Sequence, residues 1–515
     1  MNVQPQEPLA MPEAFPSPLE ATMEQRGRWI ARGGVAIFVT SLLLKGTSVL
    51  ASILIARHLG PTQLGQWALV TYVTGFAWLF IELGTGTAAV RLISGYRQTQ
   101  PDRARRVVTT YVMFEALLAM PVAAAFLFAS PWLATGLYGD PVLLPLFWLS
   151  IASLPVFALT TCQAAILQAH ERVRLLAKLG LAFGIAHALL LVTFVLLFGL
   201  VGGFVASLLA GTGQLVSYLL VMRKVMPLSL LVGRPDGKLL RAMLRYALPT
   251  FGATIFLVAF NWIGASLVTS GGSVESIGHY TVAYRVAFLA LYIPNAIVVP
   301  FFPLASGLYE RDPLEFTRTY DHTLRYTTLF VFPIVLAISA FARPLVSLLY
   351  GEDYVDAAGL LPITAAAALL ASFLSPANLA FYVTGAMRRQ AILSAAVFGV
   401  GLFILLALVP SFSIEGFAWA VFAFYAALVA LGPVFLGRAY PDRPYRVMSV
   451  TALPLSAIVL GVGMLLLRAD LFLSNLVAVA LVLGSAAVIY SRFMTPKDRR
   501  FVRSLLRGFG GAKNR

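Results

Sequence analysis

Residues 35–56 read VAIFVTSLLLKGTSVLASILIA, and this stretch decides the fold class. As a helix that rises about 1.5 Å per residue, it is long enough to cross the hydrocarbon core of a bilayer, about 30 Å thick. Lys45 lies near its middle, where a cation costs about 2.5–3.5 kcal/mol on insertion scales. We therefore expect this helix to line a wet, positively charged cavity. The alternative is a buried structural ion pair.

Similar apolar runs recur along the whole chain. Hydrophobic residues make up 59% of the sequence and charged residues 12%, whereas apolar residues form a little under half of a typical globular domain. The sequence predicts an all-α polytopic membrane protein with about 14 transmembrane helices. The predicted spans are 35–56, 66–87, 108–129, 142–167, 174–197, 201–221, 246–268, 281–305, 327–347, 359–384, 390–409, 415–437, 447–467 and 471–491. The single Cys162 excludes an intramolecular disulfide.

The net charge of +16 follows membrane topology rather than nucleic-acid binding, because basic residues fall in alternate loops. The opposite loops hold only Arg57, Arg343 and Arg468. Loops rich in Lys and Arg face the cytoplasm, so we expect a multi-pass membrane protein with both termini cytoplasmic. Residues 1–27 are expected to be disordered, with an uncleaved signal anchor after them. Residues 492–515 form a basic tail that suits anionic membrane lipid.

The chain contains an internal repeat. LGQW at 64–67 is echoed by IGHY at 277–280, and LYGD at 137–140 is echoed by LYGE at 349–352, with offsets of 213 and 212 residues. The repeated unit is six helices, so both copies have the same orientation. We expect two parallel six-helix bundles at 28–222 and 246–438, a cytoplasmic linker at 223–245 and two additional helices at 439–491. Parallel repeats place the substrate at their interface and rock against each other.

Several motifs resemble a known family. RHLGP at 57–61, GQWA at 65–68 and ELG at 82–84 with Arg91, followed by YGEDYVDAA at 350–358, are similar to signatures of the polysaccharide-repeat flippases of the multidrug/oligosaccharidyl-lipid/polysaccharide exporter superfamily. The resemblance implies alternating-access transport of an undecaprenyl-pyrophosphate-linked oligosaccharide for surface or exopolysaccharide (including lipopolysaccharide) synthesis. It also implies a place in the bacterial inner membrane and partnership with a polysaccharide polymerase and a chain-length regulator. No nucleic-acid partner is expected, because membrane topology accounts for the positive charge.

The resemblance further implies a central cavity lined by cations from the first and eighth spans, where Lys45 and Arg285 stand. Snorkelling to the interface is the alternative for Arg285. Arg91, Asn261 and Asn295 complete the candidate substrate-binding residues. The two asparagine amides suit sugar hydroxyls, or hydrogen bonds between helices.

Glu82 and Glu115 lie toward the cytoplasmic ends of the second and third spans. One of them could pair with Arg91, or one could exchange H⁺ or Na⁺ to drive transport; no other cofactor is expected. For His187 in the fifth span, the sequence indicates either a packing residue or a proton relay.

The chain carries no metal-ligand spacing, no G-x-x-x-x-G-K-[ST] phosphate loop and no GxSxG nucleophile turn, so we expect no enzyme. A cation-coupled multidrug exporter is the main alternative, and it would need cavity carboxylates. A membrane-bound polymerase or glycosyltransferase would need a much larger loop than any found here.

Overall fold

The computed structural model describes residues 23–223, 227, 231–271, 274–295, 298, 305, 308, 309, 311–436, 446–468 and 471–488. Within these ranges it describes the backbone alone for 23–45, 173–174, 313, 446–450, 471–474 and 486–488. The chain divides into two compact units, Met1–Gly46 and Thr47–Arg515. All elements described below belong to the second unit, apart from the start of α1.

Every described element is a helix, which confirms the predicted fold class. The first half of the fold holds α1 (Met23–Glu82), α2 (Thr85–Arg97), α3 (Pro101–Pro131), the π-helix η1 (Trp132–Leu137), α4 (Leu143–Ala169) and α5 (Val173–Met222). The second half holds α6 (Gly237–Ser270), α7 (Val274–Phe288), the 3₁₀-helix η3 (Leu289–Leu291), α9 (Pro313–Ala340), α10 (Ala342–Tyr350), the 3₁₀-helix η4 (Glu352–Tyr354), α11 (Ala357–Val383) and α12 (Met387–Leu436). Two further helices follow, α13 (Arg446–Leu467) and α14 (Leu471–Val488).

Three long helices each contain two predicted spans, separated by a sharp break. The breaks lie at Gly60 (φ 74°), Gly199 (φ 62°) and Ser413 (φ 46°), in a backbone region that L side chains rarely adopt. Among the described residues, eight helices are long and apolar enough to cross a membrane. The span predicted at 281–305 starts in α7 and leaves the continuously described chain after Asn295.

The helices of the second unit turn at two opposite ends, which we name separately. We call the end with the turns at Gly60, Gly139, Gly199, Gly351 and Ser413 the glycine end. We call the opposite end, where α3, α5, α6, α9 and α12 begin, the basic end. Some helices here extend past their apolar runs: α6 starts at Gly237, inside the predicted linker, because the Asp236 carboxylate accepts from the Lys238 and Leu239 amides at 2.9 and 3.3 Å.

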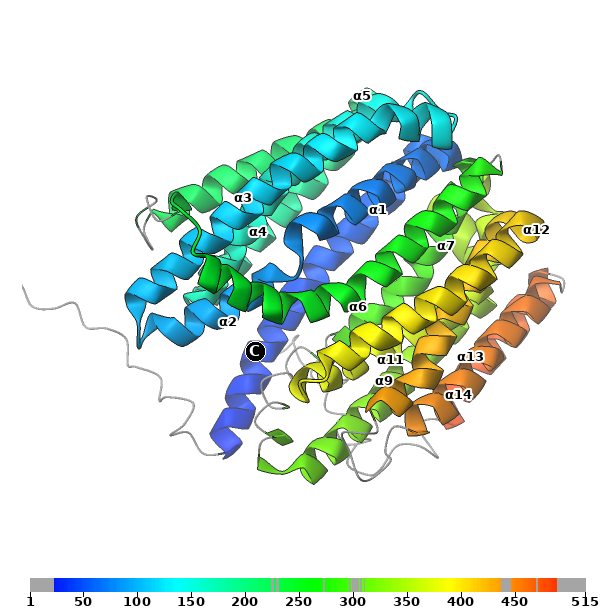
Figure 1. Ribbon diagram of the computed structural model, residues 1–515. Coiled ribbons are helices and arrows are strands. Elements are labelled where there is room, and N and C mark those ends of the chain that lie inside the picture. Colours follow the sequence, from blue (N-terminus) through cyan, green and yellow to red (C-terminus); the bar gives the residue numbers. More distant parts are fainter. Residues whose placement is uncertain are drawn as a thin grey trace, which may run out of the picture. The chain divides into compact units, whose positions relative to one another are not determined.

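The core of the second half is α11, which packs against α7, α9, α12 and α13 (Figure 1). Nearly every side chain of α11 is buried, including Phe373 and the alanines at 365–368. In the first half, α4 packs against α3 and α5, and α2 packs against α3 and α4. The helices α13 and α14 pack against α9 of the second half (Figure 1). The two halves meet along α1, α2, α6 and α7, where the candidate site lies.

Candidate functional site

A cavity of about 450 Å³ lies between the two halves. The first half contributes Ser52 and Trp67 from α1 and His187 from α5, and the second half contributes Tyr284 and Arg285 from α7. Its lining is therefore mixed, with aromatic and aliphatic walls and a few polar groups. No aspartate or glutamate is among the described residues that line it.

Arg285 is the charged group of this cavity. Its Nη1 donates to the Ser52 Oγ across the boundary between the halves, at 2.8 Å. Tyr72, Tyr350 and Tyr354 lie within electrostatic reach of the guanidinium, and it forms no ion pair with a described residue. A guanidinium presents five N–H donors in a planar fork that suits phosphate and carboxylate. The cavity therefore presents a guanidinium with the chemistry that suits an anionic group.

Lys45 belongs to the other unit, and its side chain lies outside the described residues. The backbone there is helical, as part of α1. In sequence Lys45 precedes Ser48, a residue that lines the cavity, by three positions. The pairing of Lys45 with Arg285 stays a prediction.

His187 separates the central cavity from a second one of about 300 Å³ between α4 and α5. Its Nε2 lies 3.4 Å from the Ser207 Oγ, which itself donates to the Gly203 carbonyl at 2.9 Å. This contact joins the two segments of α5 on either side of the break at Gly199.

At the glycine end the halves are joined by backbone contacts. A Cβ on Gly65 would collide with the Val274 carbonyl oxygen, and a Cβ on Gly278 would collide with that of Pro61. The Tyr354 hydroxyl donates to the Ala56 carbonyl at 2.8 Å. No side chain larger than hydrogen fits at either glycine, so this end is tightly closed.

At the basic end, Arg91 is engaged with an aromatic ring of the other half. Its guanidinium carbon lies 4.6 Å from the centre of the Tyr246 ring in α6, and the Tyr246 hydroxyl donates to that of Tyr382 at 2.7 Å. A cation over a ring in this range is attracted by the ring's quadrupole. Within the described chain Arg91 pairs with neither Glu82 nor Glu115, so the pairing considered from the sequence is absent there.

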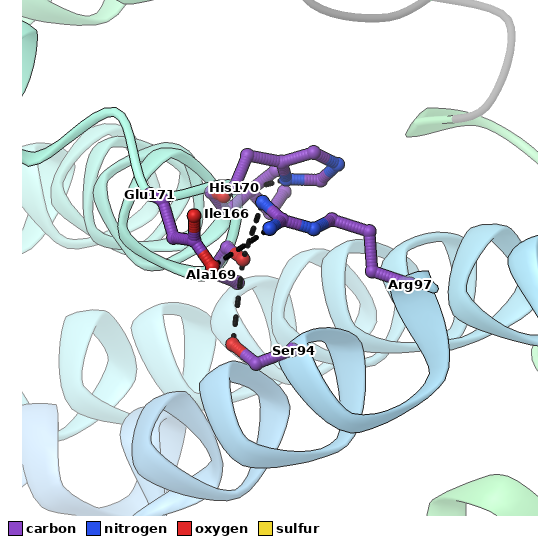
Figure 2. Close-up of polar contacts among 6 residues, drawn as sticks. All are labelled: Ser94, Arg97, Ile166, Ala169, His170 and Glu171. Carbon is purple, nitrogen blue, oxygen red and sulfur yellow. Dashed lines mark hydrogen bonds and ion pairs between the residues drawn. The ribbon is translucent and has the colours of Figure 1, made fainter. Parts of the chain in front are cut away.

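The far end of α2 is fastened to the turn between α4 and α5. Figure 2 shows Arg97 reaching Glu171, with an N···O distance of 2.7 Å, while the Ser94 hydroxyl donates to the Ala169 carbonyl at 3.3 Å. Glu171 holds a left-handed backbone conformation (φ 58°) that turns the chain between the two helices. Sequence reasoning missed this contact, because its partners stand more than 70 residues apart.

The two candidate asparagines take different places. Asn261 donates to the Leu257 carbonyl of its own helix at 2.8 Å, and it is not among the described residues that line the central cavity. The Asn295 Oδ1 accepts from the Ser375 hydroxyl at 2.8 Å. Ser375 lines a third cavity, of about 530 Å³, together with Thr250 and Asn378. Asn295 thus lies beside a largely apolar cavity with a few polar groups, lined mostly by the second half and also by Thr87 of α2.

The two candidate glutamates come together in the first half. The Glu115 side chain is completely buried and is hydrogen-bonded to the Thr85 hydroxyl, at the junction of α1 and α2. Glu82 ends α1 on the other side of that junction, and a Cβ on Gly86 would lie 3.8 Å from its Oε1. Both carboxyl groups therefore lie at this junction, apart from the central cavity.

Two helical halves around a cavity between them form a fold that several solved structures share. The structure is similar to the lipid II flippase MurJ in an inward closed conformation, with a TM-score of 0.67, 13% identity, and coverage of 90% of this chain and 100% of that chain. It is also similar to an inward-facing multidrug resistance MATE family transporter of the MOP superfamily, with a TM-score of 0.60, 16% identity, and coverage of 76% of this chain and 94% of that chain. A third similar structure is a mutant of the Vibrio cholerae MATE transporter VcmN, with a TM-score of 0.59, 16% identity, and coverage of 81% of this chain and 99% of that chain. At these identities the similarity establishes the fold alone.

The family follows from the sequence itself. Residues 54–359, well over half of the chain, match the model of the polysaccharide biosynthesis protein family, and the chain belongs to this family. The chain matches no curated protein sequence. The family resemblance expected from the Gly-rich motifs is therefore confirmed.

Proposed function

We propose that this protein is a flippase that moves an undecaprenyl-pyrophosphate-linked oligosaccharide repeat unit across the inner membrane, from the cytoplasmic to the periplasmic leaflet. The observation that carries this proposal is Arg285, a cation in a cavity between the halves whose described lining holds no acid. A pyrophosphate cannot enter a low-dielectric interior without countercharges. Arg285, with Lys45 as the second proposed cation, supplies them.

Transport then follows from the arrangement of the two halves. The head group enters from the basic end and binds Arg285 while the polyprenyl tail stays in lipid. The sugars occupy the space between the halves, where the amides and hydroxyls near Asn295 and Asn378 suit sugar hydroxyls. Parting of the glycine-end contacts exposes the head group to the periplasm. The reaction is movement and breaks no covalent bond.

A cation-coupled multidrug exporter is the competing function, because MATE transporters share the fold. An exporter of cationic compounds needs acidic groups where the substrate binds. The described lining of the central cavity offers a guanidinium instead, which favours an anionic substrate.

A deletion strain tests the proposal. Loss of the gene should cause lipid-linked repeat units to accumulate on the cytoplasmic side while surface polysaccharide disappears. Re-expression of the wild-type chain should restore export, and an Arg285→Ala chain at equal protein level should not. If the deletion strain instead makes normal surface polysaccharide and its resistance to cationic drugs changes, the result would support the cation-coupled multidrug exporter.

A further inference from the structure

The Thr85 hydroxyl is bonded to two oxygens at once. Its Oγ lies 2.6 Å from the backbone carbonyl oxygen of Glu82, and it is also hydrogen-bonded to Glu115 Oε1. A hydroxyl carries a single hydrogen, and a backbone carbonyl can only accept. When Thr85 donates to the Glu82 carbonyl, the hydrogen between Thr85 and Glu115 must come from the carboxyl group. Both bonds form together only when Glu115 carries a proton.

The surroundings of Glu115 also favour its protonated form. Glu115 is completely buried, and its Oε2 has no hydrogen-bond partner. The titratable groups that face it are Glu82 at the end of α1, Tyr111 of α3 and Cys162 of α4. None of the three supplies a positive charge. A buried carboxylate without a cation is costly, whereas a neutral carboxylic acid leaves only one weak acceptor unpaired.

We infer that Glu115 is a proton-binding site, and that its proton completes a relay from Glu115 through Thr85 to the Glu82 carbonyl that fixes the junction of α1 and α2. Loss of the proton to water leaves a carboxylate, and the single Thr85 hydrogen then serves only one of its two partners. No other bond is made or broken in this step.

The junction is also a contact between the two halves. Leu83 and Gly84 both take positive φ, 44° and 77°, and a Cβ on Gly84 would lie 3.0 Å from the Ala247 carbonyl of α6. The other end of α2 is held by Arg97 and Ser94 (Figure 2). Loosening the relay therefore frees the Thr85 end of α2 while its Arg97 end stays fixed. The proton on Glu115 thereby controls the closure of the basic end.

Spin-label distances in the full-length protein test this inference without any substrate, so the result does not depend on the proposed function. Labels at Thr87, close to Thr85 in α2, and at Arg241 of α6, both exposed, report the separation of the Thr85 end of α2 from α6, while the buried Cys162 stays unlabelled. Raising the pH should shift the wild-type distances. In Glu115→Gln the amide donates to Thr85 at every pH, so the low-pH distances should persist. Glu82→Gln is the matched control, because it keeps the relay carbonyl and should keep the response.

A second pair of variants keeps Glu115 in place. Thr85→Val removes the relay hydroxyl and should abolish the pH response, whereas Thr85→Ser restores the hydroxyl and should restore it. A pH response that survives in both Glu115→Gln and Thr85→Val would overturn the inference. So would a shift driven by Na⁺ at constant pH, or a response lost in Glu82→Gln alone.

Discussion

Gly65 and Gly278 pack against each other across the boundary between the halves: a Cβ on Gly65 would lie 3.2 Å from the backbone nitrogen of Gly278. A Cβ on Gly278 would lie 3.0 Å from the Pro61 Cα, four residues before Gly65. The two glycines occupy equivalent positions of the internal repeat, 213 residues apart. The repeat therefore meets itself at the glycine end, and we refer to this reciprocal contact as the gate.

Replacing either gate glycine by alanine should part the halves at the glycine end. The new methyl group overlaps a carbonyl oxygen that no rotamer change can move. Accessibility of a cysteine introduced near Val274 to a membrane-impermeant reagent should rise in Gly65→Ala and Gly278→Ala. The matched control is Gly75→Ala on the same helix α1, where no neighbouring atom lies within 4 Å. Equal accessibility in all three variants would contradict the gate.

The ion pair between Arg97 and Glu171 should contribute little to stability. Although the N···O distance is 2.7 Å, the Glu171 side chain is 77% exposed, and such pairs contribute about 0–1 kcal/mol. A double-mutant cycle with alanine at both positions, followed by thermal unfolding in detergent, should give a coupling energy within that range that shrinks with added salt. A coupling well above it would show that α2 is held more firmly than its exposure indicates.

Transport should depend on a proton gradient through Glu115. In vesicles, collapse of the gradient should slow flipping by the wild-type chain, because the relay at Thr85 no longer cycles. Glu115→Gln should fold normally and flip at a rate that no longer responds to the gradient. If the wild-type chain flips its substrate at the same rate without a gradient, Glu115 does not couple transport to protons. That result would not contradict the hydrogen bonds between Glu115, Thr85 and the Glu82 carbonyl.

Much of the fold follows from the sequence because membrane spans are long and apolar. Hydropathy predicts the spans, and the repeat predicts two halves of six helices each. Within the first half the two repeated motifs also meet, since the Gln66 amide donates to the Asp140 carboxylate at 2.6 Å. The conformations of Gly60, Gly199 and Ser413 were not predicted, because a break within a helix leaves no mark on hydropathy.

The candidate site was predictable only in part. A charged residue inside an apolar run singles out Arg285, but nothing local shows that Ser52, 233 residues away, is its partner. Thr85 carries no sequence signal, because its role depends on the oxygens that the fold places around it. Asn261 shows the converse case: its side chain bonds the Leu257 carbonyl of its own helix, a partner that its position in the sequence does not single out.

The most direct test of the account is the affinity of the purified protein for a lipid-linked oligosaccharide that carries a pyrophosphate. Hydrogen bonds to a charged group contribute about 1.5–3 kcal/mol, so Arg285→Ala should weaken binding by about tenfold or more, with Arg285→Lys in between. Arg343→Ala, an exposed arginine at the glycine end, should bind like the wild type. Unchanged affinity in folded Arg285→Ala protein would contradict the claim that this cavity holds the anionic head group.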